Sequence, residues 1–221
     1  MNKFFRYILI FVSGALIFFS CSRKKDRFIN RNWHALNTKY NVLFNGGVAY
    51  EAGLNDIESK YDENFWEILP IEQINIKDFS IEDDEKNSDL QRAEEKAIKA
   101  VQTHGMSIKG KEKNPQIDEA YILLGKARYY SGRFIPAIEA FNYVLFKYPG
   151  SSNINTAKVW KAKTNLRLEN EAIVLENLNL LLQKKDLNND DRLEALTTLA
   201  QLYINQSEID LAITSIEKAV D

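Results

Sequence analysis

The carboxyl-terminal half of the chain repeats itself, and this repetition constrains the fold more than any other feature of the sequence. In the best-formed unit, small residues stand at Gly125 and Ala137, an aromatic residue at Phe141 and a proline at Pro149. Two helices that cross closely need small side chains at the crossing, and a ring can fill the gap between them. Proline ends a helix because it cannot donate the next backbone hydrogen bond. The unit therefore predicts an antiparallel pair of helices.

The spacing of these residues is that of the tetratricopeptide repeat (TPR), a helix pair of roughly 34 residues. With Asp118 as position 1, further residues of the pattern are Tyr121, Leu124, Gly132, Phe134 and Leu145. One position departs from the pattern, because Arg128 stands at position 11, where Tyr is usual.

Two more units follow at similar spacing. Residues 174–178 align with 137–141, which puts Ala162 where Gly125 stands. The third unit has its matching residues at Leu199, Ala200, Tyr203, Ala212, Ile216 and Ala219. The sequence thus predicts three TPR-like repeats within residues 115–221, at about 118–151, 155–188 and 193–221. Because each repeat packs only on its neighbours, we expect an all-α, tetratricopeptide-like α-solenoid rather than a generic amphipathic bundle.

Upstream of the repeats, apolar residues recur at helical spacing over residues 28–43 and 49–61. Between them, Asn45-Gly46-Gly47 is a sequence typical of a helix break. We therefore expect an N-terminal helical hairpin over residues 28–61.

The segment that follows has no helical periodicity. Residues 62–87 contain the acidic run Glu82-Asp83-Asp84-Glu85 and predict an acidic extended linker. Residues 88–114 predict a helix followed by a polar connection to the first repeat.

The amino terminus predicts export and attachment to a membrane. Residues 1–20 contain Lys3 and Arg6, then an apolar run that is short for a bilayer span, as in a signal peptide. Ser20 precedes Cys21, the single cysteine of the chain, so Cys21 is the expected lipidation site of a bacterial lipoprotein and residues 21–27 form a basic tether. The alternative is an uncleaved anchor helix in which the cysteine is incidental.

The groove of the predicted solenoid is the candidate interaction surface. In TPR geometry, defined positions of each first helix face the concave side. The candidate partner-binding residues among them are Lys126, Tyr129, Tyr130, Lys163, Arg167, Gln201 and Asn205. Because the middle of this groove is basic and aromatic, the hypothesis is that it binds an extended acidic segment or helix of a partner protein. The alternative is that the tyrosines are buried between repeats and the cations are solvated.

The sequence offers no set of residues for catalysis, a metal or a cofactor. His34 and His104 lie far apart in sequence and have no partner at metal-ligand spacing, and one cysteine cannot form a Cys/His zinc cluster. Gly-x-Ser-x-Gly and phosphate-binding glycine motifs are absent from the sequence. The formal net charge of -2 gives no footprint for nucleic acid. We expect no enzyme activity, no cofactor, no metal and no small-molecule substrate.

Several strings resemble one family. They are Cys21-Ser22-Arg23-Lys24-Lys25, Tyr40-Asn41-Val42-Leu43-Phe44-Asn45-Gly46, Glu67-Ile68-Leu69-Pro70 and Leu124-Gly125-Lys126-Ala127-Arg128-Tyr129-Tyr130. They resemble the SprE/PorW family of TPR lipoproteins. The resemblance implies an outer-membrane lipoprotein, lipid-anchored and facing the periplasm, that supports type IX protein secretion and gliding motility through contacts with other envelope proteins.

Two further expectations accompany this resemblance. Members of that family are usually longer, so the chain is expected to be a truncated form. The alternative function is a TPR lipoprotein that assists another envelope process, such as outer-membrane protein assembly or peptidoglycan remodelling.

Overall fold

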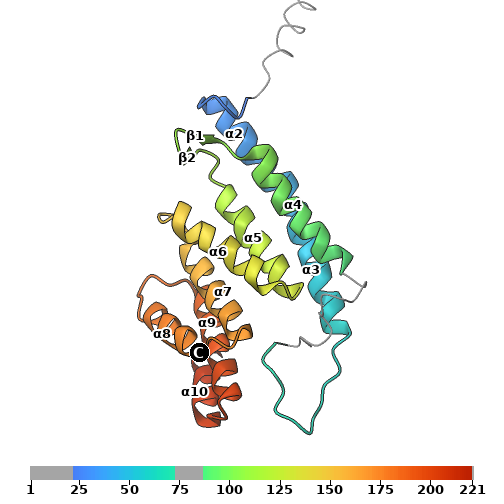
Figure 1. The fold of residues 1–221 in the computed structure, drawn as a ribbon, viewed down its shortest axis with the longest axis vertical. Helices are drawn as coiled ribbons and strands as arrows, with labels where there is room; N and C mark the ends of the chain where they lie inside the picture. The colour runs from blue at the N-terminus through green and yellow to red at the C-terminus, as the bar shows by residue number, and fades with distance from the viewer. Residues whose placement is uncertain (1–21, 73–86, 221) are drawn as a thin grey trace, which may run out of the picture.

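A computed structural model describes residues 22–72 and 87–220 of the chain, which are mostly helical (Figure 1). The predicted signal peptide, Cys21 and the acidic run at 82–85 lie outside the described residues. The elements before the repeats are α2 (Phe28–Asn37), the π-helix η1 (Thr38–Leu43), α3 (Phe44–Ser59), α4 (Ser88–His104), and the two-stranded antiparallel hairpin β1 (Ser107–Ile108) and β2 (Lys111–Glu112). In the part of the chain that is described, no helix combines the length and apolarity needed to cross a bilayer.

The three predicted repeats are three helix pairs, which confirms the all-α, solenoid-like fold. They are α5 (Ile117–Tyr130) with α6 (Phe134–Lys147), α7 (Ile154–Arg167) with α8 (Glu171–Leu182), and α9 (Asn189–Asn205) with α10 (Ile209–Val220). Each pair packs on the next along the chain, and the pairs follow one another down the molecule in Figure 1. The third pair begins earlier than expected, because the Asn188 side chain accepts a hydrogen bond from the Asp191 amide and caps α9 there.

The turn between the two helices has the same backbone conformation in all three repeats. Gly132, Glu169 and Ser207 have positive φ values of 68°, 60° and 62°, and each lies in the turn between the two helices of its repeat. In each turn the amide one residue later donates to a carbonyl five residues earlier, at 2.9 Å from Arg133 to Arg128, 3.0 Å from Asn170 to Asn165 and 2.9 Å from Glu208 to Tyr203. These bonds satisfy carbonyls at the end of each first helix.

The steric reasoning about the first repeat is confirmed. A Cβ atom at Gly125 would lie 2.4 Å from Cε1 of Phe141, and Phe141 is fully buried. The unusual Arg128 points at α4 instead of a neighbouring repeat, since its Nε donates to Oε1 of Glu94 at 2.8 Å. Glu94 also pairs with Arg133 at 2.6 Å. This ion-pair cluster joins the first repeat to the helix that precedes it.

The predicted hairpin over residues 28–61 is wrong. α2, η1 and α3 form one continuous helix, which runs antiparallel to α4: Asn87 donates to the Gly53 carbonyl at one end, and His34 meets His104 at the other. The glycines do not break the helix. Gly46 and Gly53 instead allow the helix to approach its neighbours closely. An added Cβ at Gly53 would lie 2.7 Å from Cγ of the buried Leu90.

Candidate interaction groove

The first helices of the repeats bring most of the predicted groove residues together. Tyr129 on α5, Lys163 and Arg167 on α7, and Gln201 and Asn205 on α9 line one cavity of about 210 Å³. Drug-sized ligands generally occupy pockets of about 300–1,000 Å³, so this space suits one or two side chains better. The other lining residues are Leu166, Glu169, Thr197 and Thr198 of the repeats and Ile71 and Glu72 of the linker, so this volume is the space left beside the linker. Five of the seven residues that the TPR register assigned to the groove thus line one cavity, and their binding of a partner stays a prediction.

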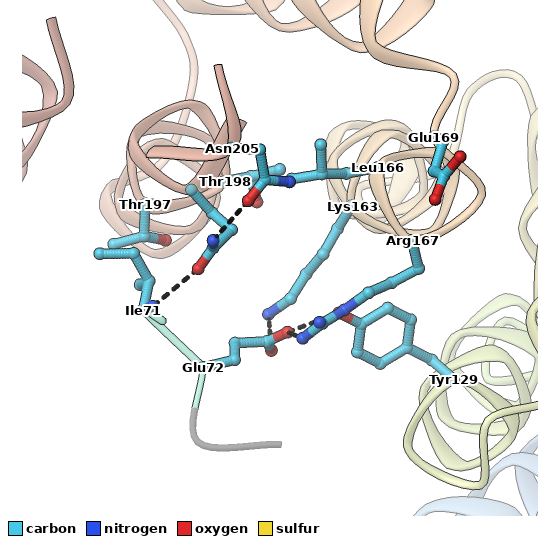
Figure 2. Close-up of a pocket in the computed structure, with 11 residues that line it drawn as sticks. Ile71, Glu72, Tyr129, Lys163, Leu166, Arg167, Glu169, Thr197, Thr198 and Asn205 are labelled. Carbon is cyan, nitrogen blue, oxygen red and sulfur yellow. Dashed lines mark hydrogen bonds and ion pairs between the residues drawn. The ribbon is translucent and has the colours of Figure 1, made fainter. Parts of the chain in front are cut away.

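A segment of the chain itself occupies this groove. Figure 2 shows Glu72, from the linker after α3, pointing its carboxylate between Lys163 and Arg167. Arg167 Nη2 donates to Glu72 Oε2 at 2.7 Å, and Lys163 pairs with Oε1. The Tyr129 hydroxyl donates to Oε2, and Arg167 Nε donates to the same hydroxyl oxygen at 2.8 Å. One carboxylate thus forms ion pairs with two cations and accepts a hydrogen bond from a phenol.

The groove also holds the backbone beside that carboxylate. The Ile71 amide donates to Oε1 of Gln201 at 2.7 Å, and Nε2 of Gln201 donates to Oδ1 of Asn205 at 2.8 Å. A backbone contact next to a charged contact is how a groove binds an extended segment, since the amide fixes the register of the strand. Gln201 therefore holds the linker backbone of the same chain and Asn205 holds the Gln201 side chain, while their role in binding a partner stays a prediction.

Electrostatics favour an ionised carboxylate in the groove. Burial would raise the pKa of Glu72, but the charges of Lys163 and Arg167 and the hydrogen bonds hold it below its ordinary value. Burial, followed by the neighbouring Glu72 charge, raises the pKa of Tyr129 well above its ordinary value, so its hydroxyl stays a donor. Lys163 pairs with Glu194 as well as with Glu72. Without Glu72, Arg167 would lose its ion-pair partner in the groove and Lys163 would keep only its pair with Glu194.

The last two predicted groove residues lie at the edge of this site. The Tyr130 hydroxyl donates to Oε1 of Glu72 at 3.0 Å, and its ring meets that of Tyr50 on α3 with centroids 5.8 Å apart. Lys126 is outside the cavity lining, and its Nζ lies 4.6 Å from the ring centroid of Trp160. Burial lowers the pKa of Lys126. Tyr129 is buried, as the alternative expected, and its hydroxyl contacts Glu72 of the same chain.

Glu72 is the functional residue that sequence reasoning missed. The prediction placed the acidic character of the linker in the run at 82–85, whereas the carboxylate in the groove is a single glutamate after Leu69-Pro70-Ile71. The signal available in the sequence was an isolated acid beside apolar residues and a proline. A proline favours an extended backbone at the residue before it.

The two histidines meet, although they are far apart in sequence. Nδ1 of His34 lies 3.1 Å from Nδ1 of His104, so α2 and the end of α4 are joined at this point. Burial, His34 and Lys99 lower the pKa of His104. Among the residues that the structure describes, no group of three or more His, Cys, Asp or Glu side chains could hold a metal ion.

Comparison with protein-family models and with curated proteins finds no match to this chain.

Proposed function

We propose that this chain is a lipid-anchored TPR-type scaffold of the bacterial outer membrane that binds an acidic, extended segment of a partner protein in the groove of its repeats. The observation that carries the proposal is the geometry around Glu72. Two cations, a buried phenol and the amide-accepting Gln201 converge on one carboxylate and on the backbone beside it. A groove that binds its own linker this way has the groups to bind a similar segment of another protein.

The site's chemistry supports binding over catalysis. Charged side chains that pair with each other in a partly buried groove supply recognition and steering of a charged partner. The tyrosine ring adds rigid contact area at a small entropic cost. The protein partners that the family resemblance implies are components of the type IX secretion and gliding apparatus, with the lipid carried by Cys21. The second candidate is a scaffold for another envelope process, which uses the same groove.

Complementation of a deletion strain tests the proposal. We expect the gene deletion to reduce secretion of surface proteins and colony spreading, and the wild-type gene to restore both. Lys163→Glu combined with Arg167→Glu should fail to restore them, because the groove would then repel an acidic segment. Lys158→Glu is the matched control, since Lys158 is on the same helix but exposed and outside the cavity lining.

The outcomes separate the parts of the proposal. Normal secretion and spreading in the deletion strain would exclude the type IX assignment. Full rescue by the groove double variant, present at wild-type abundance in the membrane, would exclude the groove as the interaction surface. Cys21→Ala tests the anchor, because the variant should leave the outer-membrane fraction.

A further inference from the structure

One face of the N-terminal helix is apolar, aromatic and exposed. It lies opposite the face that packs on α4, which carries the buried His34, Thr38, Val42 and Ala49. Each of its side chains is more than half exposed, from 53% at Trp33 to 73% at Phe28. We call this face the aromatic stripe, and its members are Phe28, Ile29, Trp33, Leu36, Tyr40, Phe44 and Val48.

The π-helix η1 keeps the stripe on one face. From Ile29 to Val48 the stripe residues are spaced by four, three, four, four and four positions, which is more than the roughly 3.6 residues of an α-helical turn. A wholly α-helical segment would rotate Phe44 and Val48 away from Ile29 and Trp33. The wider turn at Thr38–Leu43 absorbs the extra residue. The distortion therefore maintains a continuous apolar surface that is not buried in the protein core.

The tether and the first half of the helix are basic although the whole chain is not, whereas the end of α3 carries Glu51, Asp56 and Glu58. Between positions 22 and 50 the single acidic residue is Asp26, and the basic residues are Arg23, Lys24, Lys25, Arg27, Arg31 and Lys39. The formal net charge of the entire chain is -2. Positive charge is thus concentrated at the amino-terminal end of the aromatic stripe, next to Phe28.

We infer that the aromatic stripe lies in the interface of an anionic lipid bilayer, with the α2–η1–α3 helix parallel to the membrane surface. Amphipathic helices with basic polar flanks bury their apolar face about 5–10 Å into the boundary between headgroups and acyl chains. Trp and Tyr suit this boundary because one end of each ring is apolar and the other polar. Basic side chains next to the stripe would contact anionic headgroups.

The position of the aromatic stripe along the chain favours a lipid bilayer over a protein as its binding partner. This step rests on the proposed function, because it takes Cys21 as the lipid-bearing residue. The intervening tether, residues 22–27, reaches at most roughly 20 Å at about 3.5 Å per residue, so an acylated Cys21 holds Phe28 next to the bilayer. A second attachment of this kind adds to the acyl chains and fixes the orientation of the anchored molecule.

Fluorescence quenching by brominated lipid tests the inference. The full chain, with Trp66→Phe, is reconstituted in vesicles of phosphatidylethanolamine and phosphatidylglycerol, with or without brominated acyl chains. The remaining tryptophans are Trp33 and the buried Trp160. The Trp33 signal is the difference from the variant with Trp33→Phe added. We expect brominated lipid to reduce that signal at least twofold and to leave the Trp160 signal unchanged.

A matched control and flotation complete the design. With both Trp33 and Trp66 replaced by Phe, Phe146→Trp puts a tryptophan on α6 at a position that is 79% exposed, and we expect no quenching there. A chain that floats with the vesicles but shows equal Trp33 emission in both lipids would overturn the inference and leave the anchor intact. A chain that does not float would overturn the anchor and the inference together.

Discussion

Glu72 and Arg167 are 95 positions apart in the chain, yet Oε2 of the glutamate accepts a hydrogen bond from Nη2 of the arginine at 2.7 Å. This ion pair joins the linker after the N-terminal helix to the middle repeat. The carboxylate also accepts from Tyr129 and Tyr130, so its removal would affect the whole groove.

We predict that Glu72→Gln releases the linker. An amide cannot neutralise Lys163 and Arg167, and a buried pair that loses one partner leaves the other uncompensated. The Ile71 amide, which donates to Gln201, should then exchange its hydrogen at least tenfold faster. Hydrogen exchange resolved at Ile71 measures this, with Glu67→Gln at an exposed linker position as the control. Equal protection in both variants would mean that the carboxylate does not hold the linker.

Two glycine positions of α3 should respond in opposite directions to substitution by alanine. A Cβ at Gly53 would meet the buried Leu90, so Gly53→Ala should lower the free energy of unfolding by about 1–3 kcal/mol. No atom of the described residues lies within 4 Å of a Cβ at Gly47, so Gly47→Ala should raise the free energy of unfolding by about 0.5–1 kcal/mol through helix propensity. Urea unfolding of the two variants checks both values. A loss of stability in Gly47→Ala would argue that the helix breaks there.

The turn between α9 and α10 should become more stable with glycine. Ser207 has a φ of 62°, a conformation that is strained for residues with a side chain, whereas the equivalent position of the first repeat is Gly132. After the larger entropy of glycine in the unfolded chain is subtracted, Ser207→Gly should gain about 0.5–1 kcal/mol. Gly132→Ser should lose a similar amount. The midpoints of urea denaturation measure both, and a stabilised Gly132→Ser would contradict the strain argument.

The histidine pair should make the protein less stable as the pH is lowered. Because the pKa of His104 is lower in the folded chain than its ordinary value of 6.5, the unfolded chain binds more protons as pH drops through that value. The free energy of unfolding then has its full value above about pH 7 and decreases below pH 6.5. Thermal unfolding at pH 7.5 and 5.5 should show a lower midpoint at the acidic pH, and His104→Gln should reduce the difference. An unchanged difference in that variant would assign the effect to other groups.

The repeats could be predicted because their sequence rules are local. Gly125 and Phe141 meet within one helix pair, so their spacing along the chain carries the packing information. The same register placed Tyr129, Lys163 and Arg167 on a common surface. Groove positions follow from helix geometry once the repeat is aligned.

The N-terminal helix and the groove's occupant could not be predicted in the same way. Whether Gly46 breaks a helix or allows close packing depends on Leu123 and Lys96, which come from other helices. Glu72 lies in a segment without periodicity, and its role depends on cations far along the chain. In both cases tertiary contacts override the local signal.

The docked linker also sets a threshold for any competitor. Glu72 is covalently connected to the groove that it fills, so after each release it remains near Lys163 and Arg167. Connections of this kind give effective concentrations of roughly millimolar order. A dilute acidic peptide in solution would therefore leave the groove filled, whereas a partner confined to the same surface, or one that engages a second site, reaches the local concentration needed to displace Glu72.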